Sequence, residues 1–382
     1  MTITPSLQRR RRILIFSGEP LTSGYGSATA LRTFTDAVLR HTDWELVLVV
    51  PREKCAGQWR PDTRLRQIAI HPSPTASRRL RLVAYAAGAA VGALAGVLPR
   101  PDVVISWQPL PAALPGSLLA RAHRVPHVVR TCGPELSSSW SRYPRTTSLL
   151  RPCTHLLLAR ADAVVVKSEL ERSLLAAQVP RDRIHLVPNA VNERYFDAAI
   201  PTHDRPPRFL SVCQLERHKN PEVLVEAFGG MARTGVCCGG LTVVGAGALR
   251  DTLLTRVTRS GADVELPGRV AGANMPEVYA RHDVFVLASH MEGCSNAALE
   301  AMASGLPVIG TRTAVSDLVE DGSNGLLLDT PDPAALGGAL VRFLALPRQQ
   351  RIRMSRAARA RARHHAPRRL VRHYAELLDS LW

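Results

Sequence analysis

The sequence predicts an α/β protein of two Rossmann-like, doubly wound domains that face each other across a cleft. Its 382 residues exceed a typical single core and suit two domains of ordinary size. Short β-branched runs alternate with helix-like stretches, as expected for parallel βαβ units. A segment with three prolines at 200–207 interrupts this alternation as a linker would. The domain boundary is therefore expected there.

The expected strands form one group on each side of this segment. The first group is 13–16, 46–50, 103–105, 127–129, 163–166 and 185–187, and the second is 208–212, 241–244, 264–266, 284–287 and 308–309. We therefore place an N-terminal domain at 1–200 and a C-terminal domain at 208–360. Residues 361–382 are expected to form a helix that packs back on the N-terminal domain. Its apolar residues for packing are Val371, Tyr374, Leu377 and Leu378.

The formal net charge of +17 raises nucleic acid, an anionic membrane or a phosphorylated substrate as partners. Only three of the 49 basic residues are lysines, namely Lys54, Lys167 and Lys219. A GC-rich coding bias would produce so many arginines without a functional demand. Composition alone does not choose among the partners.

The cysteines and the N-terminus indicate a cytoplasmic protein. The seven cysteines are odd in number and show no C-x-x-C spacing, so neither a disulfide framework nor a zinc site is suggested. The first residues lack the apolar stretch and cleavage site of a signal peptide. Reduced thiols in the cytoplasm fit best.

Residues 82–98 form an uncharged stretch of 17 residues, the short limit for crossing a membrane. Ten of them are Ala or Gly, which contribute little transfer energy, so a buried helix is favoured over interfacial contact and over spanning. The preceding Arg78, Arg79 and Arg81 add a possible peripheral contact with an anionic membrane.

The segment 288–307 predicts a strand, a turn, a short helix and a second turn. Ser295 or Asn296 can cap the helix, Gly305 suits its left-handed end, and Pro307 prevents its continuation. Unpaired N–H groups and the helix dipole at such an N-terminus favour a phosphate. The candidate phosphate-binding residues are Gly293, Cys294, Ser295, Asn296 and Ala297.

Glu300 falls on the second turn of this helix among Ala, Leu and Met. A carboxylate is costly to bury there unless hydrogen-bond donors reach it, and a pair of ribose hydroxyls has the right chemistry. The alternative is a Glu paired with a nearby Arg.

Glu292 and Glu300 form an E-x7-E pattern that resembles the retaining, family-four (group 1) glycosyltransferases of the GT-B fold. The segments 241–247, 266–270, 306–309 and 320–326 also resemble the family's pattern in the right order. The resemblance covers about 208–340. In the N-terminal half it is weaker and depends on Gly24-Tyr25-Gly26 and the segments 101–104 and 187–192.

The resemblance implies a retaining transferase whose N-terminal domain binds the acceptor and whose C-terminal domain binds the nucleotide sugar. It implies that Glu292 lies at the donor sugar hydroxyls, that Glu300 grips the ribose and that 293–297 holds the diphosphate. Gly24, Gly26 and Val270 are the further donor-binding candidates.

Lys219 lies in a segment that resembles the family's loop carrying Arg and Lys to the diphosphate. Gln214 occupies the usual Arg position, so Arg217 is the candidate for the second cation. These cations can compensate the charge of a leaving nucleoside diphosphate without a metal, and no Asp-x-Asp motif is present. We therefore expect no cofactor or metal, a UDP- or GDP-sugar donor, and catalytic roles for Lys219 and Glu292.

Two other functions stay open. A GT-B nucleotide-sugar epimerase would form product from the donor alone. A basic, membrane-peripheral binding protein with a decayed transferase site would explain Gln214 and also Cys132, which stands where many relatives have a His. A dehydrogenase is disfavoured because no G-x-G-x-x-G follows a strand. The acceptor is open among lipid-linked, polysaccharide and small-metabolite classes, and no nucleic acid is expected as a partner.

Overall fold

The computed structural model describes residues 10–19, 26–51, 62–70, 87–89, 91–92, 96, 98–133, 136, 144–236 and 238–382. The chain divides into two compact units. The first comprises Met1–Glu135, Leu149–Val187 and Leu370–Trp382, and the second comprises Leu136–Ser148 and Pro188–Arg369. The chain therefore passes from the first unit to the second between Val187 and Pro188, ahead of the boundary expected from the proline-rich segment.

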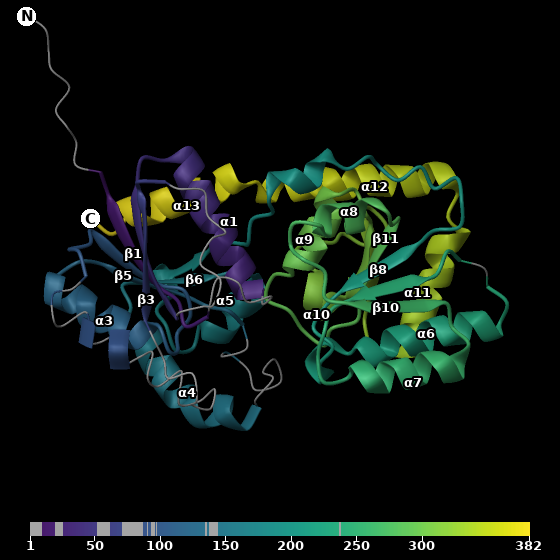
Figure 1. Cartoon of the computed structure of the whole chain (residues 1–382), viewed down its shortest axis with the longest axis horizontal. Coiled ribbons are helices and arrows are strands. Elements are labelled where there is room, and N and C mark those ends of the chain that lie inside the picture. The colour runs from purple at the N-terminus through teal and green to yellow at the C-terminus, as the bar shows by residue number, and fades with distance from the viewer. Residues whose placement is uncertain are drawn as a thin grey trace, which may run out of the picture. The chain divides into compact units, whose positions relative to one another are not determined.

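The first unit is built on a seven-stranded parallel sheet of order β3-β2-β1-β4-β5-β6-β7. Its order reverses between β1 and β4, as in a doubly wound fold. The strands are β1 (Arg12–Phe16), β2 (Glu45–Pro51), β3 (Leu65–Ile70), β4 (Val103–Ser106), β5 (His127–Arg130), β6 (Ala163–Val166) and β7 (Ile184–Leu186). The helices are α1 (Gly26–His41), α3 (Ala113–His123), α4 (Pro144–Ala159), α5 (Glu169–Leu175), the 3₁₀ turn η2 (Arg181–Arg183) and the end of α13 (Pro367–Asp379) (Figure 1).

The second unit has a six-stranded parallel sheet of order β10-β9-β8-β11-β12-β13. The strands are β8 (Phe209–Val212), β9 (Leu241–Val244), β10 (Val264–Gly268), β11 (Val284–Leu287), β12 (Val308–Thr311) and β13 (Gly325–Leu328). The helices are α6 (Pro221–Arg233), α7 (Arg250–Ser260), α8 (Met275–Ala280), α9 (Asn296–Ala303), α10 (Arg312–Val315), α11 (Pro333–Ala345) and α12 (Arg348–Ala362), with the 3₁₀ turns η3 (Glu193–Asp197), η4 (Arg217–Lys219) and η5 (Arg363–His365).

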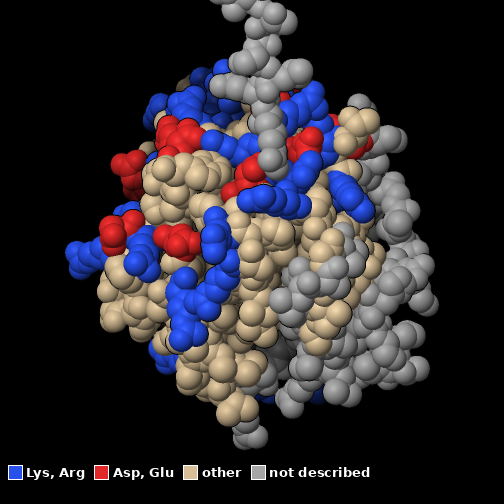
Figure 2. Space-filling model, turned by 90° about the vertical axis from the view of Figure 1, so that its left-hand side faces the viewer, with Lys and Arg blue, Asp and Glu red and all other residues tan. Residues whose placement is uncertain are grey.

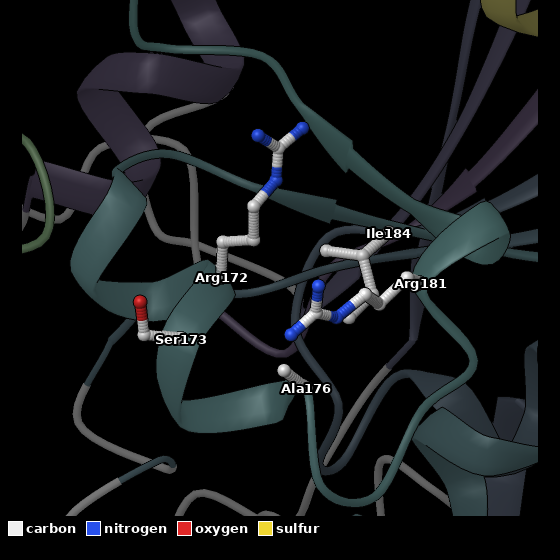
Figure 3. Close-up of a pocket in the computed structure, with 5 residues that line it drawn as sticks. All are labelled: Arg172, Ser173, Ala176, Arg181 and Ile184. Carbon is white, nitrogen blue, oxygen red and sulfur yellow. The ribbon is translucent and has the colours of Figure 1, made fainter.

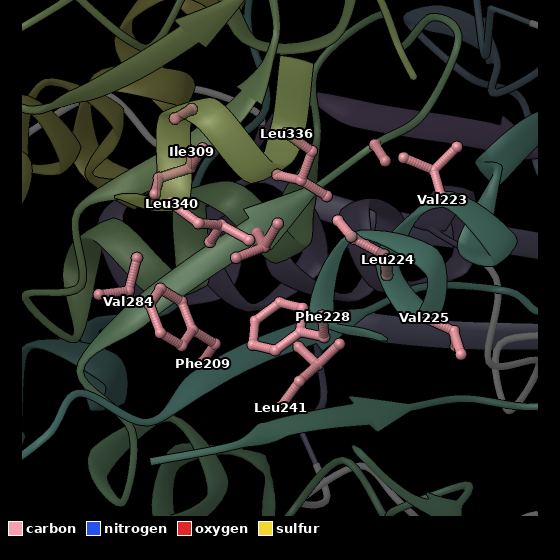
Figure 4. Packing of buried hydrophobic residues seen from close by; sticks show 14 of the residues in the cluster. Phe209, Val223, Leu224, Val225, Phe228, Leu241, Val284, Ile309, Leu336 and Leu340 are labelled. Atoms are coloured by element: carbon pink, nitrogen blue, oxygen red, sulfur yellow. The ribbon is translucent and has the colours of Figure 1, made fainter. Parts of the chain in front are cut away.

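Two apolar clusters cover the faces of the second sheet. On one face α6, α7 and α11 pack against it, and on the other face α8, α9 and α12 do so (Figure 1). In the first cluster the ring of Phe209 packs edge-on against Phe228, with ring centroids 5.3 Å apart (Figure 4). The ring of Phe343 also packs edge-on against Phe209, at 6.4 Å. The prediction of two doubly wound domains is confirmed. The close packing around Phe209 fixes β8, whose carboxyl end begins the candidate site.

Two strands were not anticipated. Both β3, which is half-exposed, and β13 are edge strands. The sequence of β13 is Gly-Leu-Leu-Leu, which carries no β-branched residue. Strands β3 and β13 form because they pair with the neighbouring strands β2 and β12, and this pairing cannot be recognised from the local sequence.

Of the expected helix 361–382, Leu370–Trp382 belong to the first unit, whereas 361–369, which include η5 and the start of α13, belong to the second. Tyr374 of α13 is fully buried, and its ring centroid lies 4.7 Å from that of Phe34 in α1. Val371, Leu377 and Leu378 are buried as well, as expected from the amphipathic pattern.

The proline-rich segment belongs to the second unit. His203 packs edge-on against Phe343, and its Nε2 lies 3.0 Å from Ser355 Oγ in α12. This buried contact explains why the change of unit comes earlier than the sequence pattern indicates.

Candidate functional site

The candidate site lies where the strand order of the second sheet reverses. Strands β8 and β11 are neighbours there, although β9 and β10 lie between them in sequence. Loops that follow such a pair of parallel strands diverge and leave a crevice at the carboxyl edge of the sheet. Lys219 follows β8 and Glu292 follows β11, so the two candidate catalytic residues come from the two loops at this edge.

The loop after β8 is held close to the loop after β9. A side chain at Gly245 would begin 1.8 Å from the carbonyl oxygen of Cys213, and one at Gly247 would begin 2.3 Å from that of Leu215. Both glycines are therefore required by the close approach of the two backbones. The chain then enters η4, and Asn220 adopts the left-handed conformation (φ 51°, ψ 45°) before α6 begins. These constraints fix the position of Lys219.

Lys219 and Glu292 form an ion pair within hydrogen-bond distance. Lys219 Nζ donates to Glu292 Oε1 over 2.5 Å, and Ser289 Oγ donates to the same oxygen over 2.9 Å. Burial raises the pKa of Glu292, but the Lys219 charge and the hydrogen bonds from Lys219 and Ser289 outweigh it. The pKa therefore lies below its ordinary value, and Glu292 is a carboxylate at neutral pH.

The loop that carries Glu292 is tied to its surroundings by backbone contacts. The His290 amide donates to the His218 carbonyl, and the Glu292 amide donates to the Thr313 carbonyl, both over 3.3 Å. Thr313 Oγ1 donates to the His290 carbonyl over 2.6 Å. The hydroxyl and the carbonyl of Thr313 therefore support the Glu292 loop.

Helix α9 begins where the sequence places it. Ser295 is the N-cap, because its Oγ accepts from the Ala298 amide over 3.3 Å, and Gly305 takes the positive φ of 85° at the other end. The first-turn amides and the helix dipole make this end favourable for an anion. Glu292 and Lys219 therefore lie at the same sheet edge as a helix N-terminus suited to phosphate.

Glu300 lies in contact with two tyrosines, Tyr279 and Tyr195. The hydroxyl of Tyr279, in α8, donates to Glu300 Oε2 over 2.9 Å. Burial and the Glu300 charge raise the pKa values of Tyr279 and Tyr195, so both are neutral phenols. The rings of Tyr195 and Tyr279 pack edge to face at 5.5 Å. Neither tyrosine gives a functional signal in the sequence, because a tyrosine in a helix or turn is usually a core residue.

The other predicted residues are spread more widely. Val270, Cys294 and Ala297 pack against the apolar cluster around α9. Arg217 begins η4 and is exposed. Gly26 is the first residue of α1 in the first unit, and Gly24 lies outside the described residues.

A separate pocket of about 330 Å³ occurs in the first unit. Its lining comes from the end of α5 and the start of β7, so it lies at the amino end of that edge strand (Figure 3). Both of its arginines are exposed, and Arg172 is paired with Glu169 over 3.0 Å. The lining residues are Arg172, Ser173, Ala176, Arg181 and Ile184, and none is a predicted site residue.

Two family models match consecutive parts of the chain. The model "Glycosyl transferase 4-like domain" matches 26–190, and "Glycosyl transferases group 1" matches 206–345. Together they cover both units, and the second contains Lys219, Glu292 and Glu300.

Several curated proteins are similar to part of the chain. The putative colanic acid biosynthesis glycosyltransferase WcaL of Escherichia coli K12 is 27% identical over 237 residues, which are 59% of this chain and 58% of WcaL. A D-inositol 3-phosphate glycosyltransferase of Corynebacterium urealyticum is 31% identical over 182 residues, which are 44% and 42% of the two chains. The chain spans about half the length of the curated relatives it matches.

Solved structures are similar over nearly the whole chain. Sucrose-phosphate synthase from Thermosynechococcus elongatus has a TM-score of 0.82 at 19% identity and covers 97% of this chain and 99% of its own. Anabaena HepE in complex with UDP and glucose has a TM-score of 0.77 at 17% identity, and the match covers 97% of this chain and 100% of the HepE chain. At these identities the likeness establishes the GT-B fold.

Proposed function

The chain belongs to the group 1 glycosyltransferases of the GT-B fold, and we propose that it transfers a sugar from a nucleotide-sugar donor to an acceptor with retention of configuration. The observation that carries this proposal is the Lys219–Glu292 pair beside the N-terminus of α9. An ammonium group has three N–H donors. One is used by Glu292, which leaves donors for the oxygens of a diphosphate.

The proposed reaction needs no metal, because cations of the chain compensate the leaving group. The bond between the anomeric carbon and the diphosphate oxygen breaks, and the bond to the acceptor oxygen forms on the same face of the sugar. The acceptor's proton passes to the leaving diphosphate. Lys219, with Arg217 nearby in η4, and the N-terminus of α9 stabilise the negative charge that develops there. Glu292 accepts hydrogen bonds from the donor sugar hydroxyls.

The test is incubation with a panel of nucleotide sugars, UDP- and GDP-sugars first, while release of the nucleoside diphosphate is followed. HepE, a structural relative, binds UDP and glucose, which makes UDP-glucose the first donor to try. An epimerase would instead convert the donor without releasing the diphosphate. A decayed transferase would do neither, and the intact contact of Lys219 with Glu292 argues against that alternative.

We expect Glu300→Ala to weaken binding of the nucleotide. The substitution removes the carboxylate proposed to hold two ribose hydroxyls, a loss of about 1.5–3 kcal/mol for a charged hydrogen-bond site. Calorimetry with the nucleoside diphosphate measures this loss. Tyr279→Phe is the companion variant, because it removes the hydroxyl that contacts Glu300 and keeps the ring in the core. Unchanged affinity in the Glu300 variant would remove the ribose role.

We also propose a weak peripheral contact with anionic membranes. The residues that first indicated it, Arg78 to Leu98, lie mostly outside the described residues. Within the described part of the chain no helix is long and apolar enough to cross a bilayer. The face in Figure 2 carries basic side chains interspersed with acidic ones, which gives no uniform basic surface there.

Helix α4 gives this proposal support. Leu149 and Leu156 are 79% and 49% exposed, and their spacing of seven residues places them on one side of the helix. The exposed Arg160 follows Leu156 by four residues, one turn further along the chain. Each Arg near an anionic surface contributes about 1 kcal/mol, which salt screens.

Sedimentation with anionic vesicles should therefore show binding at low salt that is lost at high salt. Replacing Leu149 and Leu156 together by Ser should weaken it, whereas Leu174→Ser, an exposed leucine on α5, should not. Absence of binding at low salt would refute the membrane contact. Binding that persists at high salt would indicate apolar insertion instead.

A further inference from the structure

The side chain of Asn189 joins the start of the second unit to the candidate phosphate loop. Asn189 is 5% exposed and lies two residues after the chain leaves the first unit. Its Nδ2 donates to the Cys294 carbonyl over 3.0 Å and to Asn296 Oδ1 over 2.8 Å. Both acceptors belong to the 293–297 segment before and at the start of α9. One amide group therefore fixes the backbone and a side chain of this loop.

The backbone of Asn189 is itself held by η5. His365 Nδ1 lies 3.1 Å from the Asn189 carbonyl, and the Val191 amide donates to the His365 carbonyl over 3.0 Å. A carbonyl oxygen can only accept, so the imidazole Nδ1 carries the hydrogen. Burial lowers the pKa of His365 to about 4, which keeps the ring neutral at physiological pH. The contacts with His365 therefore hold the backbone of Asn189, while its side chain contacts the 293–297 loop.

The contact also determines which way the Asn296 amide is turned. Because Asn296 Oδ1 accepts the hydrogen bond from Asn189, the Asn296 Nδ2 group occupies the opposite position and acts as a donor. A donor beside a helix N-terminus suits a phosphate oxygen, whereas a carbonyl in that position would repel one.

We propose that Asn189 is a positioning residue for the donor diphosphate, which holds the Cys294 carbonyl and turns the Asn296 amide so that its NH₂ group faces the phosphates. The inference rests on the proposed function, because it assigns the diphosphate to the 293–297 loop. Asn189 acts through the loop and not on the substrate. Its contribution should therefore concern the diphosphate and spare the nucleoside, which Glu300 is proposed to hold.

The test compares each nucleoside diphosphate with its own nucleoside by calorimetry, using UDP, GDP and ADP with uridine, guanosine and adenosine. Asn189→Ala should weaken the diphosphate that the wild type binds by about tenfold, the loss expected for one or two hydrogen bonds. Binding of the matching nucleoside should change by less than about twofold. Asn189→Asp should weaken the diphosphate further, because it places a carboxylate against two carbonyl-type oxygens.

Asn192→Ala is the matched control, from the same Asn-Ala-Val-Asn segment. Asn192 Oδ1 accepts from the Arg194 amide over 3.1 Å at the start of η3, so its loss should leave both affinities within about twofold. Thermal unfolding verifies that each variant folds, and Asn189→Ser serves if the Ala variant does not.

Coupling between Asn189 and Asn296 supplies a second readout. If Asn189 acts partly by turning the Asn296 amide, adding Asn189→Ala to Asn296→Ala should weaken the diphosphate by clearly less than Asn189→Ala does in the wild type, the remainder being the lost contact with the Cys294 carbonyl. Equal losses for nucleoside and diphosphate, or fully additive effects, would overturn the positioning role. A wild-type protein that binds none of the three diphosphates would instead contradict the proposed function.

Discussion

Lys219→Ala is expected to lower kcat/KM for sugar transfer by about 10²–10³-fold or more, the effect of removing one group that stabilises developing negative charge. Two physical effects add in this variant. The leaving diphosphate loses a cation, and Glu292, whose side chain is only 15% exposed, is left as a carboxylate without its partner. That carboxylate would then repel the diphosphate. Steady-state kinetics with the identified donor measures the loss.

The matched control for Lys219 is Arg256→Ala. Arg256 is also a cation of the second unit paired with carboxylates, Glu222 over 2.8 Å and Glu226, but it lies on α7. Its removal should change kcat/KM by less than about threefold, since surface ion pairs contribute little. A Lys219→Ala protein that folds and retains more than a tenth of the wild-type activity would contradict the assigned role.

Glu292→Ala is expected to lower kcat by about 10²-fold while the affinity for the nucleoside diphosphate is kept or improved. The carboxylate is proposed to bind the donor sugar, which the nucleoside diphosphate lacks. Its removal also takes a negative charge away from the phosphates and leaves Lys219 to interact with them. Glu292→Gln, which keeps the size of the side chain, should show the same division between kcat and affinity.

Glu277→Ala controls for loss of a carboxylate from the second unit. Glu277 is exposed on α8, and its nearest cation is Arg281 at 4.0 Å, so kcat should stay within about twofold. A Glu292 variant with normal kcat would contradict the proposal. So would a variant whose affinity for the nucleoside diphosphate falls by the same factor as its kcat.

The fold was predictable because its signals are local. Apolar runs such as those of β8 and β11 mark buried strands, and Ser295 and Gly305 mark the ends of α9 by their capping chemistry. The residues 188–207 were harder to assign. Prolines indicate irregular backbone, but they do not show on which unit it packs, and the burial of His203 against Phe343 depends on a residue 140 positions away.

The candidate site was only partly predictable for the same reason. Glu300 was predicted because a carboxylate on an apolar helix needs hydrogen-bond donors, and Glu292 and Lys219 were predicted from the resemblance to the group 1 glycosyltransferases. Tyr279 and Asn189 gave no such signal, since a tyrosine in an apolar helix and an asparagine after a strand have ordinary structural explanations. Their contacts with Glu300 and with the 294–296 loop emerge only from the tertiary fold.

The most direct test of the central claim is a transfer assay with the identified nucleotide sugar in excess chelator, in which the anomeric configuration of the product is read by NMR. We expect the wild type to release one nucleoside diphosphate for each sugar transferred, with the donor's configuration retained and no divalent ion required. Lys219→Ala should fall to background in the same assay. Activity that appears only when divalent ions are restored, or a product of inverted configuration, would contradict the account.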